Sequence, residues 1–199
     1  MRVLMVNGSA KASGCTARAL REVGETLQKE GIEYEIYQLG GDPIKDCTGC
    51  GACRKTGKCI FKDPDLTEFL EKAEKADGFV FGTPVYYAHP SGRILSFLDR
   101  VFYSAGSLFK GKPGAAVCSC RRAGEVCSMD VLNKYFTINA MPIASSTYWN
   151  GVHGSTAEQV EMDTEGLQTM RNIGHSMANL LKNENRAVME TGNRTDFIR

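Results

Sequence analysis

The sequence predicts a doubly wound α/β fold, in which a five-stranded parallel sheet of order 2-1-3-4-5 is covered by helices on both faces. Two observations carry this prediction. Short runs of β-forming residues alternate with segments of helical periodicity along most of the 199 residues. One run, Phe79 to Phe81, is apolar throughout, which is typical of strands buried on both faces. In such folds the loops at the carboxyl ends of the strands gather at one edge and form the ligand site.

The amino-terminal part of the chain supplies two strands and two helices. Residues 3–6 are β-formers, and apolar residues recur at helical spacing from Thr16 onward. The alternating segment 32–39 predicts the second strand. Asp63 followed by a proline predicts a helix N-cap, and that helix ends near Asp77. The remaining predicted elements are, in order, strand 79–81, helix 94–102, strand 115–118, helix 125–136, strand 141–144 and a helix from about 163 to 181.

These elements predict one domain over residues 1–182, with a cysteine-rich loop at 43–62 inserted after the second strand. The tail at 183–199 ends in apolar residues, and we expect it to contact a partner subunit.

Composition excludes several classes of protein. The net charge of +1 argues against a nucleic-acid or membrane-surface partner. No apolar run has the length of a membrane span, and the first residues do not resemble a signal peptide. We therefore expect a cytoplasmic protein, and the eight cysteines then need another role than a disulfide framework.

The loop after the first strand has the composition of an anion cradle. Ser9, Ser13 and Thr16 supply hydroxyls, Lys11 supplies charge, and Gly14 precedes a predicted helix N-terminus. Neither the Walker spacing nor the dinucleotide glycine pattern is present. A single monophosphate such as that of FMN fits this loop. An ordinary strand-to-helix turn with a Ser/Thr cap is the alternative.

Four cysteines lie within the predicted loop, at Cys47, Cys50, Cys53 and Cys59. Two consecutive C-x2-C steps let one loop supply three corners of a 4Fe-4S cluster, with a fourth ligand a few residues later. Zinc usually takes two C-x2-C pairs separated by a longer spacer, so a cluster is favoured over zinc, and free thiols remain possible. For the cysteines near the fourth strand, Cys118, Cys120 and Cys127, we expect core packing.

Three other patterns in the sequence each have two interpretations. Cys15 and Arg21 have the C-x5-R spacing of a phosphatase, but the intervening residues have helical periodicity. His89 is a candidate proton relay, with a loop histidine of no catalytic role as the alternative. The aromatic segment 148–150, with His153, either stacks on a substrate or a neighbouring flavin, or forms a structural cap.

Several sequence blocks together resemble the NADPH-dependent FMN reductase group of flavodoxin-like proteins. The blocks are residues 8–16, 82–87 with 91–92 and 97–100, 121–124 and 142–150. Within that group, the compact cysteine spacing resembles the iron-sulfur flavoproteins. The resemblance extends from Val3 to about Lys182.

The resemblance implies a site for FMN and identifies its residues. The phosphate group would rest on the first loop, and the ring between the loops after the third and fourth strands. The implied FMN-binding residues are Ser9, Lys11, Gly14, Cys15, Thr16, Thr83, Pro84, Val85, Tyr86, Tyr87, Ser119, Arg121, Arg122 and Gly124. The family pattern more often has Asn where this chain has Cys15. No side chain is expected to act as a nucleophile, because the chemistry belongs to the flavin.

The predicted function is electron transfer by an FMN-dependent oxidoreductase. Electrons from NAD(P)H or a ferredoxin-like donor would reach FMN and a 4Fe-4S cluster, and leave to a quinone, oxygen or another protein. One alternative is a cluster-free NAD(P)H:FMN or quinone reductase. Another is a flavodoxin-type electron carrier without a substrate of its own. The resemblance also implies a homodimer or homotetramer with the flavin near an interface.

Overall fold

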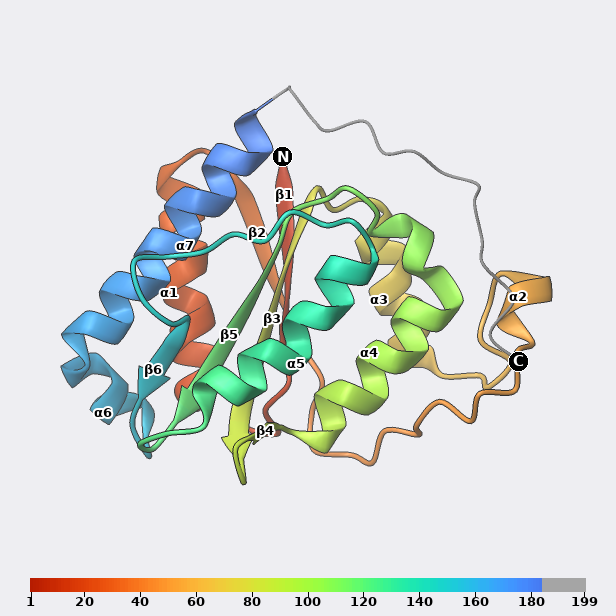
Figure 1. Ribbon diagram of the computed structural model, residues 1–199, viewed down its shortest axis with the longest axis horizontal. Helices are drawn as coiled ribbons and strands as arrows, with labels where there is room; N and C mark the ends of the chain where they lie inside the picture. Colours follow the sequence, from red (N-terminus) through yellow and green to blue (C-terminus); the bar gives the residue numbers. More distant parts are fainter. Residues whose placement is uncertain (184–199) are drawn as a thin grey trace, which may run out of the picture.

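The computed structural model describes residues 1–183, and its centre is a parallel sheet (Figure 1). The strands are β1 (Arg2–Asn7), β2 (Glu33–Gln38), β3 (Gly78–Tyr86), β4 (His89–Pro90), β5 (Gly114–Cys120) and β6 (Gly151–His153). Five of them form a parallel sheet of order β2-β1-β3-β5-β6, and β4 pairs antiparallel with the end of β3. This is the order that the sequence predicts.

The helices form two layers around this sheet. They are α1 (Cys15–Lys29), α2 (Cys53–Thr56), α3 (Pro64–Glu74), α4 (Gly92–Ala105), α5 (Glu125–Ile138), α6 (Ala157–Met162) and α7 (Thr164–Lys182), with a 3-10 turn at Gly106–Leu108. Figure 1 shows α1 and α7 on one side of the sheet and α3, α4 and α5 on the other. Within residues 1–183, no helix is both long and apolar enough to cross a membrane.

Alternation of side chains along the strands creates two separate cores. In β1, Leu4 and Val6 pack under α3, α4 and α5, whereas Val3 and Met5 pack under α1 and α7. Successive side chains of a strand point to opposite faces, so a strand covered on both faces must be apolar at every position. This explains why the central strands have no polar positions over most of their length.

The prediction for the fifth strand is wrong in position. Residues 141–144 form one isolated parallel bridge, between Ile143 and Gly114. The strand that borders β5 is β6, which begins after the loop at 145–150. Pro142 has no N–H to donate, and the chain leaves the sheet two residues later, so the edge strand is divided into two pieces.

Two short helices were absent from the predictions. These are α2, within the cysteine-rich loop, and α6, whose N-cap Thr156 accepts a hydrogen bond from the backbone N–H of Gln159. The predicted start of α3 is confirmed, because the Asp63 side chain accepts hydrogen bonds from the first-turn N–H groups. The tail expected to contact a partner lies, beyond Asn183, outside the described residues.

A charged network joins α1 to α7. Glu22, on α1, accepts hydrogen bonds from Arg18 at 2.8 Å and from Arg171 of α7 at 2.5 Å. Burial alone would raise the pKa of Glu22, but the hydrogen bonds from Arg171 and Arg18 outweigh it and lower the pKa below its ordinary value of 4.5. The ionised form is therefore favoured in the folded protein.

Replacing Glu22 with glutamine is expected to lower the free energy of unfolding by about 1–3 kcal/mol at neutral pH, the range for a lost charge-assisted hydrogen bond. Because the folded-state pKa is depressed, the contribution is present above pH 4.5 and is lost as the pH falls further. Urea unfolding at pH 7 and at pH 4 checks this expectation. A difference between wild type and Glu22→Gln that does not shrink at low pH would contradict it.

Candidate functional site

A pocket of about 550 Å³ lies at the carboxyl ends of the strands, where α1 and α6 begin. Its size is within the range of about 300–1,000 Å³ that is usual for small-molecule sites. Ten of the fourteen predicted FMN-binding residues line it: Ser9, Lys11, Gly14, Cys15, Thr16, Pro84, Val85, Tyr86, Ser119 and Arg121. The structure therefore gathers residues from three loops that are far apart in the sequence.

The loop between β1 and α1 is held by two buried or half-buried amides that sequence reasoning missed. Asn7 donates to the carbonyl of Lys11 at 3.2 Å, and its side-chain oxygen accepts from the N–H of Ser9 at 3.1 Å. Gln38, at the end of β2, donates to the carbonyl of Ser9 at 2.7 Å. These bonds fix the loop before any ligand binds, so its polar groups are already oriented.

The N-terminus of α1 opens into the pocket. Its N-cap is Gly14, which has no side chain to satisfy the N–H groups of the first turn. These donors and the helix dipole favour an anion at this point. The hydroxyls of Thr16 and Ser119 lie 2.8 Å apart, and they join the first loop to the end of β5.

A tight hairpin between β3 and β4 forms the opposite side of the pocket. Tyr87 and Ala88 occupy its two central positions with φ of 51° and 59°, values that non-glycine residues seldom adopt. Gly124 packs against this hairpin, since a Cβ there would lie 2.8 Å from Cα of Ala88. Gly124 therefore allows the close approach of two loops instead of lining the pocket.

The other three predicted residues outside the pocket have different positions. Thr83 is fully buried, and its hydroxyl accepts a hydrogen bond from the N–H of Ser91 and donates to the carbonyl of Pro84. The side chains of Tyr87 and Arg122 are exposed and do not line the pocket. Thr83 thus holds the loop in shape, while Tyr87 projects from it.

One wall of the pocket was not predicted. It consists of the loop residues Gly154, Ser155 and Thr156 and the first two residues of α6, Ala157 and Glu158. The sequence offers little signal for this wall, because β6 has only three residues and was itself missed. Ser155 and Thr156 add hydroxyls opposite the first loop.

The structure does not support the phosphatase pattern. Cys15 is the first residue of α1, so the residues between it and Arg21 are helical and cannot wrap a phosphate. Burial raises the pKa of the Cys15 thiol, although its own backbone N–H and Lys11 lower it in part. A thiol nucleophile needs the opposite shift.

Two further candidates from the sequence lie at the surface. His89 is exposed on β4, opposite Tyr86, and does not line the pocket. Tyr148 and Trp149 are also exposed, with ring centroids 6.2 Å apart. The neighbouring Asn150 is buried and accepts hydrogen bonds from the Cys118 backbone and the Ser146 hydroxyl.

The four cysteines of the predicted cluster loop line one hollow of about 100 Å³ beside α4. All four, Cys47, Cys50, Cys53 and Cys59, are free thiols. Three glycines between or beside them have positive φ, Gly49, Gly51 and Gly57. The backbone can therefore turn sharply enough to direct several thiols toward one point.

A buried arginine supports this loop from α4. The guanidinium of Arg100 donates to Asp63 at 2.5 Å and to the carbonyl of Phe61 at 3.3 Å, and one nitrogen lies 3.8 Å from the sulfur of Cys59. Burial alone would lower the pKa of Arg100, but the bonds to Asp63 and Cys59 raise it, so the group stays charged. Among residues 1–183, no group forms a hydrogen bond with its Nε.

The remaining three cysteines differ in environment. Cys118 is fully buried in the core, as expected, and burial raises its pKa to about 12. Cys120 is also buried, but its thiol donates to the carboxylate of Glu125 at 3.4 Å. Cys127 is exposed on α5, so the expectation of core packing is wrong for that residue.

Comparison with known proteins identifies a matching family. A family model described as NADPH-dependent FMN reductase matches residues 1–154. An iron-sulfur flavoprotein of Methanocaldococcus jannaschii is 30% identical over 190 residues, which cover 92% of this chain and 98% of the relative. An iron-sulfur flavoprotein of Methanosarcina thermophila is 25% identical, with coverage of 92% and 96%.

Solved structures show the same architecture. An NAD(P)H:quinone oxidoreductase from Methanothermobacter marburgensis superposes with a TM-score of 0.66 at 15% identity, covering 87% of this chain and 97% of that structure. An archaeal flavodoxin superposes with a TM-score of 0.62, also at 15% identity. At this level of identity, the likeness concerns the fold alone.

Proposed function

The chain belongs to the NADPH-dependent FMN reductase family, and we propose that it passes electrons between NAD(P)H or a ferredoxin-like donor and an acceptor through FMN and a 4Fe-4S cluster. The resemblance inferred from its sequence blocks is confirmed, and the protein is an FMN-dependent oxidoreductase. The donor, the acceptor, the cluster and the binding residues belong to the proposal.

The pocket at the carboxyl ends of the strands has the donor set that FMN needs. The uncapped N-terminus of α1, with Ser9, Lys11 and Thr16, would hold the phosphate group. Pro84, Val85 and Tyr86, with Ser119 and Arg121, would lie along the ring. Bound FMN accepts a hydride and releases single electrons, and the chain's part is to orient the ring and tune its potential.

The hollow at the cysteine loop has the donor set of a cluster. Cys47, Cys50, Cys53 and Cys59 would ligate the four irons, and the buried guanidinium of Arg100 would offset part of the negative charge. Relatives that match nearly the whole chain are named iron-sulfur flavoproteins. The convergence of four free thiols on one hollow is the observation that carries this part of the proposal.

A cluster-free reductase is the second candidate, because the FMN pocket and the cysteine hollow have no lining residue in common. A flavin reaction in the first pocket therefore does not require the second. Curated relatives also include FMN-dependent NADPH-azoreductases of Staphylococcus aureus, at 28% identity over 57% of this chain. A homodimer or homotetramer with the flavin near its interface is part of the proposal, and the mass of the protein in solution tests it.

The test is anaerobic purification, followed by a visible spectrum and counts of iron and acid-labile sulfide. We expect flavin bands with a broad shoulder and about four irons per chain, and Cys50→Ser should lose the iron while it retains the flavin. Cys127→Ser is the matched control, since that exposed cysteine lies outside the hollow and should leave both counts unchanged.

The outcomes separate the candidates. If the wild-type protein contains flavin but no iron, the cluster is rejected and the cluster-free reductase is supported. If it contains no flavin, the whole proposal is overturned. Steady oxidation of NAD(P)H with a quinone distinguishes an enzyme from a pure carrier.

A further inference from the structure

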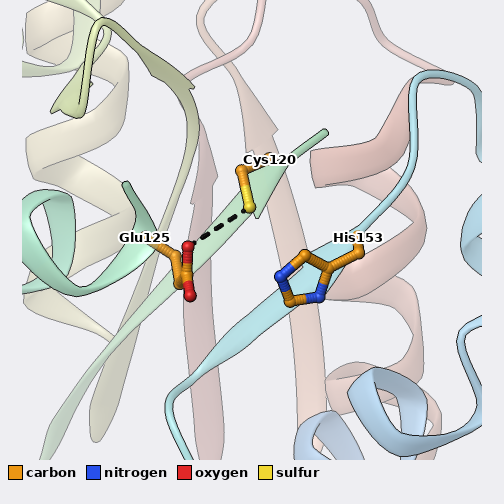
Figure 2. A group of neighbouring side chains, drawn as sticks. All are labelled: Cys120, Glu125 and His153. Atoms are coloured by element: carbon orange, nitrogen blue, oxygen red, sulfur yellow. Dashed lines mark hydrogen bonds between the residues drawn. The ribbon is translucent and has the colours of Figure 1, made fainter. Parts of the chain in front are cut away.

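Three side chains of metal-ligand type meet outside the cysteine loop. The sulfur of Cys120, a carboxylate oxygen of Glu125 and a ring nitrogen of His153 all lie within 4.8 Å of one another. Figure 2 shows them converging from the ends of two strands and the start of a helix. None of the three was predicted as a ligand from the sequence.

Sheet geometry explains why two of these groups meet. Cys120 and His153 are direct partners in the parallel register of β5 and β6. Cys118, two residues before Cys120, belongs to the core under α5, and Val152, next to His153, belongs to the opposite core. Because side chains alternate along a strand, Cys120 and His153 both project on the side of α5.

The third group is supplied by the N-terminus of α5. Glu125 is the first residue of that helix and follows Gly124, whose φ of 96° turns the chain sharply back over the sheet. Its carboxylate accepts the thiol hydrogen of Cys120 at 3.4 Å. The backbone of three elements thus fixes the three positions, with the ligand atoms within 4.8 Å of one another.

A fourth residue, Asp163, lies beside the imidazole. Oδ2 of Asp163 accepts the backbone N–H of His153 at 2.7 Å and lies 3.5 Å from Nδ1 of its ring. In Figure 2 the other ring nitrogen faces Cys120 and Glu125. In metal sites, the histidine nitrogen that does not bind the metal usually donates to a carboxylate, a backbone carbonyl or water. That hydrogen bond fixes the tautomer and the orientation of the ring.

We propose that Cys120, Glu125 and His153 form a binding site for a divalent transition metal of the Zn²⁺ class. One thiolate, one imidazole and one carboxylate are a donor set that zinc accepts in tetrahedral geometry. On binding, the thiol proton of Cys120 passes to solvent and a metal–sulfur bond forms. Three protein ligands leave a fourth position for water or an oxygen of a bound molecule.

The site borders the FMN pocket, because Cys120 also lines that pocket. It is separate from the cysteine loop, with which it has no residue in common. A metal held here would place a positive charge and an open coordination position beside the flavin-binding residues of β5. The inference does not depend on the cluster, and flavin content reports independently on the proposed function.

Titration of the purified holoprotein with Co²⁺, followed by displacement with Zn²⁺, tests this site. We expect one equivalent of Co²⁺ to bind per chain with a thiolate-to-metal absorption band and tetrahedral d–d bands at longer wavelengths than the flavin. The same spectrum is expected for a variant in which Cys47, Cys50, Cys53 and Cys59 are all replaced by serine, because that variant has no competing thiolates in the cysteine loop. Cys120→Ser and His153→Gln are expected to lose the band, and their affinity for the metal should fall at least about 100-fold.

Control variants distinguish ligation from a general disturbance. Cys127→Ser lies on the same helix as Glu125 but outside the group, and it should retain the band. Asp163→Asn can still cap α7, but it removes the negative charge beside the imidazole of His153. We expect this variant to bind Co²⁺ about 10–100-fold more weakly. A band that survives in Cys120→Ser but vanishes in the variant without the four loop cysteines would assign the metal to the cysteine loop and overturn the proposal. So would the absence of binding in a wild type that retains its flavin.

Discussion

Replacing Asp63 with alanine is expected to lower the free energy of unfolding by about 4 kcal/mol, because breaking a buried ion pair strands an uncompensated charge. The stranded group is Arg100, whose side chain is only 2% exposed and which donates to Asp63 at 2.5 Å. The same carboxylate also caps α3 through the N–H groups of Asp65 and Leu66. One substitution therefore removes both a counter-ion and a helix cap.

Two variants separate these contributions in urea unfolding. Asp63→Asn retains a good N-cap and loses only the charge, so it measures the ion pair. Asp65→Ala removes a nearby acidic side chain that is exposed, and should change stability by less than about 0.5 kcal/mol. Equal effects of Asp63→Ala and Asp65→Ala would contradict the assignment of Arg100 as a buried, paired charge.

We also expect Asp63→Ala to lose iron. Asp63 pairs with the guanidinium of Arg100, and one nitrogen of that guanidinium lies 3.8 Å from the sulfur of Cys59.

The second large effect is expected at Gly8, where the loop proposed to hold the FMN phosphate leaves β1. A Cβ on Gly8 would lie 2.8 Å from the carbonyl oxygen of Gly82 and 2.8 Å from Cβ of Ile94. Gly8 also donates its N–H to Gly82 and accepts from the hydroxyl of Ser91. Gly8→Ala must displace the loop, with a loss of about 1–3 kcal/mol in stability, as for other overpacked sites.

Displacement of this loop should weaken FMN binding at least about tenfold, the equivalent of 1.4 kcal/mol. Fluorescence titration of the flavin-free protein with FMN measures the change. Gly92→Ala is the matched control, because the added Cβ would have no atom within 4 Å among residues 1–183, apart from its chain neighbours and the backbone of its own helix. Alanine is also the better helix former. If Gly8→Ala bound FMN as tightly as Gly92→Ala, the close approach of Gly8 and Gly82 would have no role in shaping the site.

Much of the architecture follows from local sequence signals. The core strands are short and apolar and alternate with helices, one of which, α3, begins at a clear side-chain cap, Asp63. This alternation predicts a doubly wound parallel sheet, and the strand order is one of the two that are common in such sheets. The edge strand was misplaced because Met141 to Ala144 is the more apolar segment, whereas Gly151 to His153 has no strand-like pattern. Hydrogen bonds to β5 decide its position, and these depend on tertiary contacts.

The part of the pocket lining that lies in one continuous loop could be anticipated from the sequence. Lys11, Gly14 and Thr16 are close in sequence, so their composition alone indicates an anion site. Residues that come together across strands have no such signal. The partnership of Cys120 with His153 depends on the register of β5 and β6, which the misplaced strand concealed. Likewise, nothing near Arg100 in the sequence indicates that it lies beside the cysteine loop.

The divided edge strand also affects how the protein avoids aggregation. A long flat strand at the border of a sheet is a template on which another chain can add by backbone pairing. β6 offers only three residues at one border, and the loop at 145–150 interrupts any continuation toward Ile143. At the other border, β2 carries Glu33 and Glu35, charges of the kind that discourage such pairing. Contacts between copies of this chain are therefore expected to use helices and loops, and growth of the sheet from chain to chain is disfavoured at both borders.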